Sequence, residues 1–276
     1  WLSAVMEEDA RILISPYHHG LKPYADYVQQ FGNLRTPFFT NSLGFRDASP
    51  REVSLKRKCR RILFIGDSIT EGVGVVYGKT FVGLIAKEIE KDGGEVLNAA
   101  IQTYSHQIYY AKIVHFVKTV GLEISEVVAF VDLGDMANDV TQYKFDDKGN
   151  VVRIDPNCRY GFGCRMRPMK RFKFWLKDNS ILYRLYKEFK KYRRESKARS
   201  VDSLTAATNI PGLRWTFLDS EYREYAEKGM EIADRSMSRL NDYLSARGIG
   251  LTIAVYPLPD QTVQRDLDSN PVQFWP

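Results

Sequence analysis

Residues 66–70, Gly-Asp-Ser-Ile-Thr, contain the clearest candidate for nucleophilic chemistry in this chain. They follow a short, mostly apolar run that is typical of a strand buried on both faces. Gly66 permits a sharp turn after that strand, and Asp67 and Thr70 can hydrogen-bond to the backbone of the turn. The hydroxyl of Ser68 then lies at the mouth of a sheet, where a neighbouring base would activate it for acyl transfer. We therefore expect Ser68 to attack an ester.

Alternating strand and helix patterns from residue 60 onward predict the frame that positions this serine. The predicted strands are residues 61–65, 95–98, 127–131 and 251–255, and the predicted helices are residues 81–90, 107–120 and 221–247. Strands separated by helices favour right-handed crossovers, and so a parallel sheet with helices on both faces. Ligands of such sheets bind at the carboxyl ends of the strands. Ser68 is therefore expected where a substrate would lie.

Two segments stand outside that alternation. Residues 1–59 form a lead-in, and residues 140–213 form an insertion. Within the insertion, strand patterns at 143–145 and 151–154 around Asp-Asp-Lys-Gly-Asn predict a hairpin. Residues 180–197 predict a helix whose apolar stripe is surrounded by Lys and Arg. Because 276 residues can form one large domain, we expect a single α/β domain that spans residues 1–276.

The Gly-Asp-Ser-Ile-Thr segment closely resembles the first motif block of the SGNH (GDSL) hydrolases, a family of esterases, lipases and acetyl-transferring relatives. The resemblance extends over residues 60–259, apart from the insertion, and Thr40 to Asp47 is similar to the lead-in of some envelope-associated bacterial members. It implies a flavodoxin-like, three-layer α/β/α fold around a central parallel sheet. It also implies that Ser68 is the nucleophile and that its backbone N–H contributes to the oxyanion hole. No metal or organic cofactor is implied.

The second and third motif blocks of the family are altered in this chain. The family has an Asn-x-Gly type segment after the second strand, and here Thr103 or Ala100 stands where that glycine is expected. After the third strand the family has Gly-x-Asn-Asp, whereas this chain has Asp-Leu-Gly-Asp, which ends at Asp135. The resemblance then implies that Thr103 or Asn138 supplies the remaining oxyanion donor. Gly66, Asp67 and Asp135 would support the motif. Some relatives that act on O-acetyl groups of polysaccharides resemble this Asp-x-small-Asp version.

The fourth block, Asp-x-x-His, supplies the general base and its orienting carboxylate in the family, and it does not occur here. Two interpretations follow. Either the missing part of the fold lies beyond Pro276, or this is a degenerate member without its base. The second interpretation gives an alternative function, a non-catalytic SGNH-like domain that binds a carbohydrate or an acyl group.

The chain has 4 histidines, and all of them precede the place of the missing block. His106 opens a predicted helix at the same end of the sheet as Ser68, which makes it a candidate base, although a histidine at a helix start is more often a capping or surface residue. His115 lies deep in that helix. The adjacent pair His18 and His19 could bind a metal, but adjacent side chains rarely point at one ion, so we favour a structural role.

A phosphate-binding loop is a competing interpretation of Gly78-Lys79-Thr80. Such a loop requires a glycine five residues before Gly78, where this chain has Val73. The loop should also begin where the preceding strand ends, at Ile65, and it does not. The spacing therefore argues against nucleotide hydrolysis.

The 3 cysteines leave the redox environment open. Cys158 and Cys164 flank a short loop that contains glycine, and they could form a disulfide in an oxidising compartment. Two free thiols are an equally good interpretation. Cys59 would remain unpaired in either case.

Composition and charge bear on location. With 44% hydrophobic and 27% charged residues, the chain is not disordered, and no stretch approaches the ~20 apolar residues of a membrane span. Residues 165–199 hold 14 basic and 3 acidic residues, a net charge of +11 in a chain of +6, which leaves −5 elsewhere. One interpretation of this basic, aromatic-rich segment is a solvated helix face whose apolar stripe packs on the core, and contact with an anionic membrane surface or an acidic polysaccharide is an equally good one. Binding to a nucleic acid is a weaker interpretation. Because the chain begins at Trp1, we expect a bacterial periplasmic or envelope protein whose N-terminal signal or anchor was removed.

Overall fold

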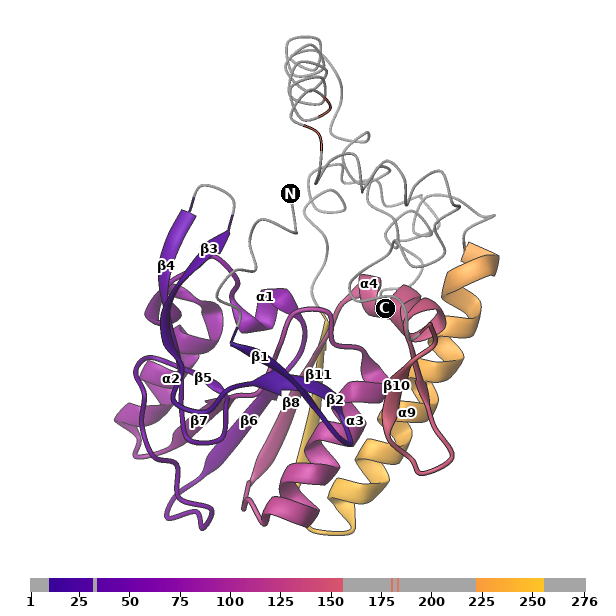
Figure 1. The fold of residues 1–276 in the computed structure, drawn as a ribbon. Coiled ribbons are helices and arrows are strands. Elements are labelled where there is room, and N and C mark those ends of the chain that lie inside the picture. Colours follow the sequence, from indigo (N-terminus) through magenta and orange to yellow (C-terminus); the bar gives the residue numbers. More distant parts are fainter. Residues whose placement is uncertain (1–9, 32–33, 156–179, 181–182, 184–221, 256–276) are drawn as a thin grey trace, which may run out of the picture.

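A seven-stranded mixed β-sheet forms the centre of the structure, in the order β11-β8-β6-β7-β5-β4-β3 (Figure 1). The structure is a computed structural model, and it describes residues 10–31, 34–155, 180, 183 and 222–255. Four neighbouring strands, β11, β8, β6 and β7, run parallel, whereas β5, β4 and β3 continue the sheet in antiparallel fashion. The chain therefore has an α/β fold built on a mixed sheet.

The strands are β1 (Arg11–Ile14), β2 (His18–Leu21), β3 (Asp26–Phe31), β4 (Leu34–Thr40), β5 (Arg46–Asp47), β6 (Arg61–Ile65), β7 (Glu95–Asn98), β8 (Glu126–Val131), β9 (Tyr143–Phe145), β10 (Val151–Arg153) and β11 (Gly250–Val255). The α-helices are α1 (Ser68–Glu71), α2 (Phe81–Lys91), α3 (His106–Val114), α4 (Leu133–Thr141) and α9 (Glu227–Ser245). A 3-10 turn (Tyr77–Lys79) and two π-helical turns (His115–Val120 and Tyr222–Ala226) complete the described elements.

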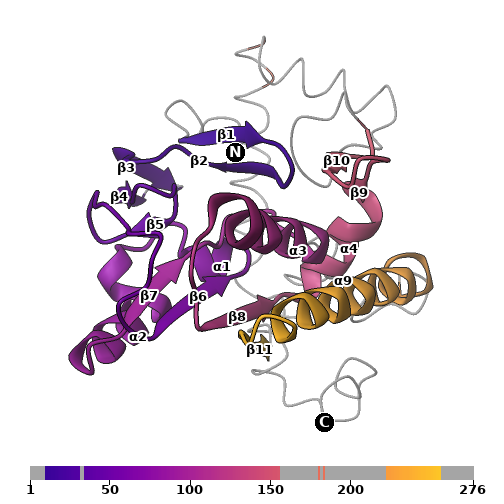
Figure 2. The same ribbon diagram turned by 90° about the horizontal axis from the view of Figure 1, so that it is seen from below.

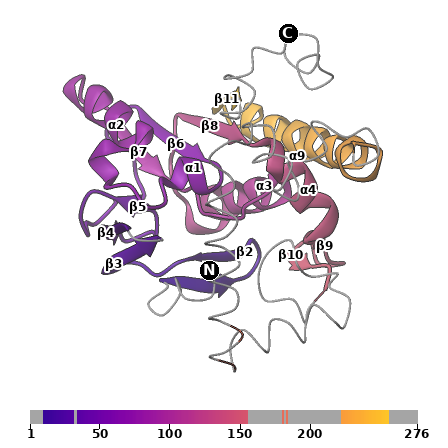
Figure 3. The ribbon, with the colours of Figure 1, turned by 90° about the horizontal axis from the view of Figure 1, so that it is seen from above.

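Strand β6 is buried on both faces, as its apolar sequence predicts. Leu63 and Ile65 point into one core, which contains residues of α3 and α9. Ile62 and Phe64 point into a second core, which contains residues of α2. Helices thus pack on both faces of the parallel strands, with α2 on one face and α3 on the other (Figures 2 and 3).

The expectation of a parallel sheet was correct for only part of the sheet. The lead-in supplies β3, β4 and β5, which add an antiparallel half through the single register pair Arg46↔Asn98 between β5 and β7. Alternating side chains of β4 are buried, among them Thr36, Phe38 and Thr40. This period of two along β4 is the pattern of a strand with one covered face, so the sequence of the lead-in already contains a strand signal. The lead-in therefore belongs to the sheet itself.

The predicted strands and the hairpin of β9 and β10 are confirmed, with ends that differ by at most one residue. Two predicted helices are less regular than expected. The helix predicted at 107–120 is α3 followed by a π-helical turn, in which Phe116 packs against Phe45 with ring centroids 4.6 Å apart. The turn ends at Gly121, whose φ of 80° suits glycine. The helix predicted at 221–247 begins with a π-helical turn and continues as α9.

Other predictions fall on residues that the structure does not describe. Cys158 and Cys164, most of the helix predicted at 180–197 and nearly all of the basic segment at 165–199 lie outside the described residues. Among the helices that are described, none is long and apolar enough to cross a membrane.

Candidate functional site

Ser68 is the first residue of α1, in the turn that follows the carboxyl end of β6. Asp67 caps this helix, because its side chain accepts a hydrogen bond from the backbone N–H of Ile69 at 3.0 Å. The hydroxyl of Ser68 donates to Asp67 Oδ2 at 3.1 Å. Asp67 is buried and Ser68 is half-buried. The capped turn therefore holds the Ser68 hydroxyl at the edge of the sheet where ligands of parallel sheets bind.

Gly66 is needed in this turn for a reason that differs from the expected one. A Cβ atom at this position would lie 2.7 Å from Thr70 Cβ, closer still to Thr70 Oγ1, and 3.2 Å from Phe130 Cβ. The φ of Gly66 is not positive, so the position does not require the left-handed backbone that glycine permits. Glycine is required here because α1 folds back tightly over the end of β6, and no side chain fits between them.

The loop after β7 lies directly beside the Ser68 turn. Asn98 Nδ2 donates to the carbonyl of Thr70 at 2.8 Å, and the N–H of Ile101 donates to the carbonyl of Gly66 at 3.2 Å. Within this loop Thr103 has a φ of 68°, in the left-handed region that threonine seldom adopts. This is one of the two positions where the resemblance led us to expect a glycine. The backbone there has a glycine-like conformation without a glycine.

The third strand end is the N-terminus of α4, which follows β8. Asp132 caps this helix by accepting from the N–H of Gly134 at 3.0 Å, and the Asp135 side chain accepts from the N–H of Asp132 at 3.3 Å. The buried carboxyl of Asp135 also accepts from the hydroxyl of Tyr109 at 2.6 Å. Burial raises the pKa of Asp135 well above its usual value, and the carboxylates of Asp67 and Asp132 raise it further. Asp135 therefore links α4 electrostatically to the turn that carries Ser68.

Asn138, the other predicted oxyanion donor, lies in the second turn of α4 and is buried. Its Oδ1 accepts a hydrogen bond from Gln142 Nε2 at 2.5 Å, one helical turn further on. Hydrogen bonds thus connect the loop of Thr103 to the Ser68 turn, whereas the described side-chain hydrogen bond of Asn138 is to Gln142, the C-cap of its own helix.

His106 opens α3 as predicted, but it is not a surface residue. Its side chain and that of Asp139 are both 0% exposed, and His106 Nδ1 lies 2.6 Å from Asp139 Oδ2. The other ring nitrogen, Nε2, is buried and has no hydrogen-bond partner among the residues that the structure describes. The described contacts join His106 to Asp139 and Ser68 to Asp67. They do not connect His106 to the candidate nucleophile.

His19 contacts the loop of Thr103, and His18 contacts His19. Their Nδ1 atoms lie 2.8 Å apart, and His19 Nε2 lies 3.3 Å from the carbonyl of Gln102. Burial lowers the pKa of His18 to about 4, with help from the positive charge of Arg153. Burial also lowers the pKa of His19 well below its usual value. In the part of the chain that the structure describes, no cluster of three or more His, Cys, Asp or Glu could hold a metal.

Three buried charged residues around the turn were not predicted as site residues: Arg46, Glu71 and Lys112. Lys112 Nζ donates to the carbonyl of Ala99 at 2.8 Å and to the hydroxyl of Tyr104 at 3.0 Å, so it holds both ends of the loop that contains Thr103. Burial lowers its pKa well below the usual value. A signal was present in the sequence, because Lys112 is four residues after the buried Ile108 and so falls on the buried face of the helix.

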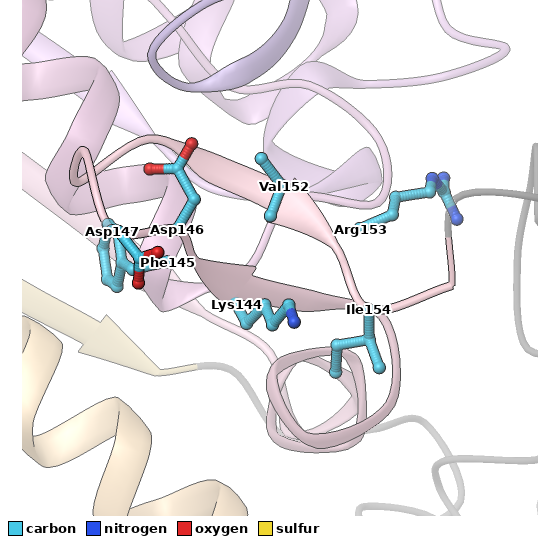
Figure 4. Close-up of a pocket in the computed structure, with 7 residues that line it drawn as sticks. All are labelled: Lys144, Phe145, Asp146, Asp147, Val152, Arg153 and Ile154. Atoms are coloured by element: carbon cyan, nitrogen blue, oxygen red, sulfur yellow. The ribbon is translucent and has the colours of Figure 1, made fainter.

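A hollow of about 420 Å³ lies elsewhere, at the hairpin of β9 and β10 (Figure 4). It is lined by Lys144, Phe145, Asp146, Asp147, Val152, Arg153 and Ile154. None of these residues is among the predicted site residues, and the hollow therefore gives no support to the chemistry expected of Ser68.

Comparison with known proteins adds no assignment, since no protein-family model matches this chain and no curated protein matches its sequence. The function has to be inferred from the residues themselves. Three segments converge at one edge of the parallel strands: the capped turn of Ser68, the loop of Thr103 and the capped start of α4.

Proposed function

We propose that this protein is an SGNH-type serine ester hydrolase or O-acyltransferase that acts on an acyl or acetyl ester of a polysaccharide or a lipid. One observation carries the proposal: a half-buried serine opens a capped helix directly after a buried parallel strand, and the loop that follows the neighbouring strand is hydrogen-bonded to that turn. The finer fold that we propose is the flavodoxin-like, three-layer arrangement, which is supported by α2 on one face of the sheet and α3 on the other.

In the proposed reaction, Ser68 Oγ forms a bond to the acyl carbon and loses its proton to a base. The carbonyl oxygen becomes an oxyanion, which accepts hydrogen bonds from the N–H of Ser68 and from a donor in the loop of Thr103. The alcohol leaves with a proton, and water or an acceptor hydroxyl then releases the acyl group from Ser68. Loss of one oxyanion donor typically slows such a reaction by about 10²–10³-fold. No step requires a metal or an organic cofactor.

The left-handed backbone of Thr103 supports its part in this scheme. A positive φ at a threonine costs about 1–3 kcal/mol, and such strain persists where the surroundings impose it. Strained residues of this kind cluster at active sites. The conformation therefore favours Thr103 over Asn138, whose described hydrogen bond lies within α4, as the second oxyanion donor.

Turnover of a short acyl ester by the full-length protein tests the proposal. Ser68→Ala should abolish turnover and leave the thermal unfolding midpoint nearly unchanged, because Ser68 is only half-buried. Ser125→Ala is the matched control, since Ser125 is also half-buried but immediately precedes β8, at the opposite end of the strand from Asp132. A wild type without Ser68-dependent turnover would refute the hydrolase and the transferase alike.

A non-catalytic domain that binds a carbohydrate or an acyl group is the second candidate. The described contacts of the serine and the histidine favour it, because they do not join the two residues: Ser68 pairs with Asp67, and His106 pairs with the buried Asp139. This candidate predicts that an acetylated oligosaccharide binds with equal affinity to wild type and to Ser68→Ala, without release of acetate from either.

For the location we propose the bacterial periplasm or cell envelope. The basic segment at residues 165–199, with its net charge of +11, would contact anionic lipid or polysaccharide. Nucleic acid is not proposed as a partner, because no recognised nucleic-acid module surrounds these charges.

A further inference from the structure

Arg46 lies on the two-residue strand β5 and is among the most deeply buried side chains of the molecule, at 1% exposure. Its guanidinium does not pair with a carboxylate within hydrogen-bonding distance among the described residues. Nη1 donates to the carbonyl of Glu71 at 2.8 Å and to that of Gly72 at 2.6 Å, and Nη2 donates to the carbonyl of Val75. All three carbonyls belong to the end of α1 or to the loop that follows it.

Those contacts answer a specific need of α1. The helix has four residues, and the N–H of Gly72 donates to the carbonyls of Ser68 and Ile69, so the carbonyls of Thr70 and Glu71 need partners outside the helix. Buried backbone carbonyls are costly when they are left unpaired. Asn98, the register partner of Arg46 across β5 and β7, donates to the carbonyl of Thr70 at 2.8 Å. Two paired strands therefore hold the carbonyl end of the helix whose first residue is Ser68.

Glu71 connects the same helix to the second loop of the site. Its side chain is 0% exposed, and Oε2 accepts a hydrogen bond from the backbone N–H of Gln102 at 2.7 Å. Gln102 directly precedes Thr103, and its side chain accepts from Arg11 Nη2 at 2.7 Å. One carboxylate thus couples α1 to the residue next to the proposed oxyanion donor.

We propose that Arg46 and Glu71 are positioning residues that set the distance between the Ser68 hydroxyl and the loop of Thr103. Arg46 fixes the end of α1 against the sheet, and Glu71 fixes the loop against α1. This inference rests on the proposed function for its effect on turnover, because the distance matters to a reaction only if Ser68 is the nucleophile. Its structural part, the coupling of the two segments, does not depend on any activity.

A purely stabilising role is the competing explanation, and Arg61 offers the matched control. Arg61 is also buried, at 2% exposure, and its Nε donates to Glu95 at 2.6 Å. It is the first residue of β6, so it lies at the end of the strand opposite to Ser68. Removing either arginine takes a buried cation out of the fold, but only Arg46 contacts the helix of Ser68.

The first test compares Arg46→Met, Glu71→Gln and Arg61→Met in turnover of a short acyl ester by the full-length protein. A misplacement of about 1 Å can cost about 100-fold in rate, so kcat should fall by about 100-fold in Arg46→Met while KM changes less than about twofold. Glu71→Gln keeps an oxygen that can accept from Gln102, so its loss should be smaller. Arg61→Met should lower the unfolding midpoint and leave kcat within about twofold of wild type.

Hydrogen exchange of backbone amides tests the coupling even if the protein proves to have no turnover. Arg46→Met should raise exchange by about tenfold or more both at residues 68–76 and at residues 99–104, whereas Arg61→Met should not raise it at either segment. Glu71→Ala should affect mainly residues 99–104. Equal exchange of these segments in Arg46→Met and Arg61→Met, or equal losses of kcat in the two variants, would overturn the inference. Absent turnover together with coupled exchange would refute the proposed function alone.

Discussion

Asp135→Asn should make the protein increasingly more stable than wild type as the pH rises. The carboxyl of Asp135 is 1% exposed, and its burial, together with the nearby carboxylates of Asp67 and Asp132, raises its pKa well above the usual value. Asparagine has the same size and keeps an oxygen that can accept the hydrogen bond from Tyr109. It carries no proton whose loss would leave a charge in this buried site.

The direction of this change in stability follows from the number of protons bound by the folded and by the unfolded protein. The unfolded chain loses the Asp135 proton near the ordinary pKa of about 3.9, whereas the folded protein keeps that proton to a higher pH. The stability due to Asp135 is therefore fully present below about pH 4 and is lost as the pH rises through the folded pKa. Within that window a difference of one proton changes the free energy of unfolding by about 1.4 kcal/mol per pH unit.

Urea denaturation of wild type and Asp135→Asn between about pH 5 and 8 measures this difference, and groups common to both proteins cancel. Asp146→Asn is a control of opposite sign, because hydrogen bonds from Asn150 lower the pKa of Asp146. That variant should lose stability relative to wild type above the ordinary aspartate pKa, and the loss should disappear in acid. A constant difference between wild type and Asp135→Asn across this range would refute the reasoning.

Three further predictions follow. Gly66→Ala should cost about 1–3 kcal/mol of unfolding free energy because its Cβ would overlap Thr70, whereas Gly78→Ala, whose Cβ would meet nothing within 4 Å, should cost far less. Lys112→Met should cost about 1–3 kcal/mol, because the buried carbonyl of Ala99 loses this donor and the Tyr104 hydroxyl keeps only its hydrogen bond to the carbonyl of His19. This cost should grow with pH in denaturation experiments because burial lowers the pKa of Lys112. Binding to anionic vesicles should fall steeply with added salt. It should also fall when the five basic residues within 187–194 are replaced by Gln, since each contributes about 1 kcal/mol to binding. Equal binding to neutral and anionic vesicles would contradict this prediction.

The turn of Ser68 was predictable because all of its signals are local. An apolar run ends at Ile65, and residues suited to a turn follow at once. The N-cap of Asp67 and the start of α1 at Ser68 agree with that pattern. The same local signals predicted the hairpin of β9 and β10, whose turn is built on Asp146.

The rest of the site depends on contacts between distant residues, which a local pattern does not contain. His106 and Asp139 are 33 positions apart, and they meet only because α3 packs against α4. Strand β5 has two residues, too few to show a period, yet it brings Arg46 to the end of α1. The left-handed backbone of Thr103 runs against the preference of threonine and is imposed by its surroundings.

Reaction of the full-length protein with a fluorophosphonate probe, followed by mass spectrometry of its peptides, tests the central claim most directly. The probe forms a covalent bond only with a serine that is activated and faces oxyanion donors. The account predicts a single labelled site at Ser68, no label in Ser68→Ala and full labelling in Ser125→Ala. A folded wild type that remains unlabelled at Ser68, or a label that persists in Ser68→Ala, would contradict it.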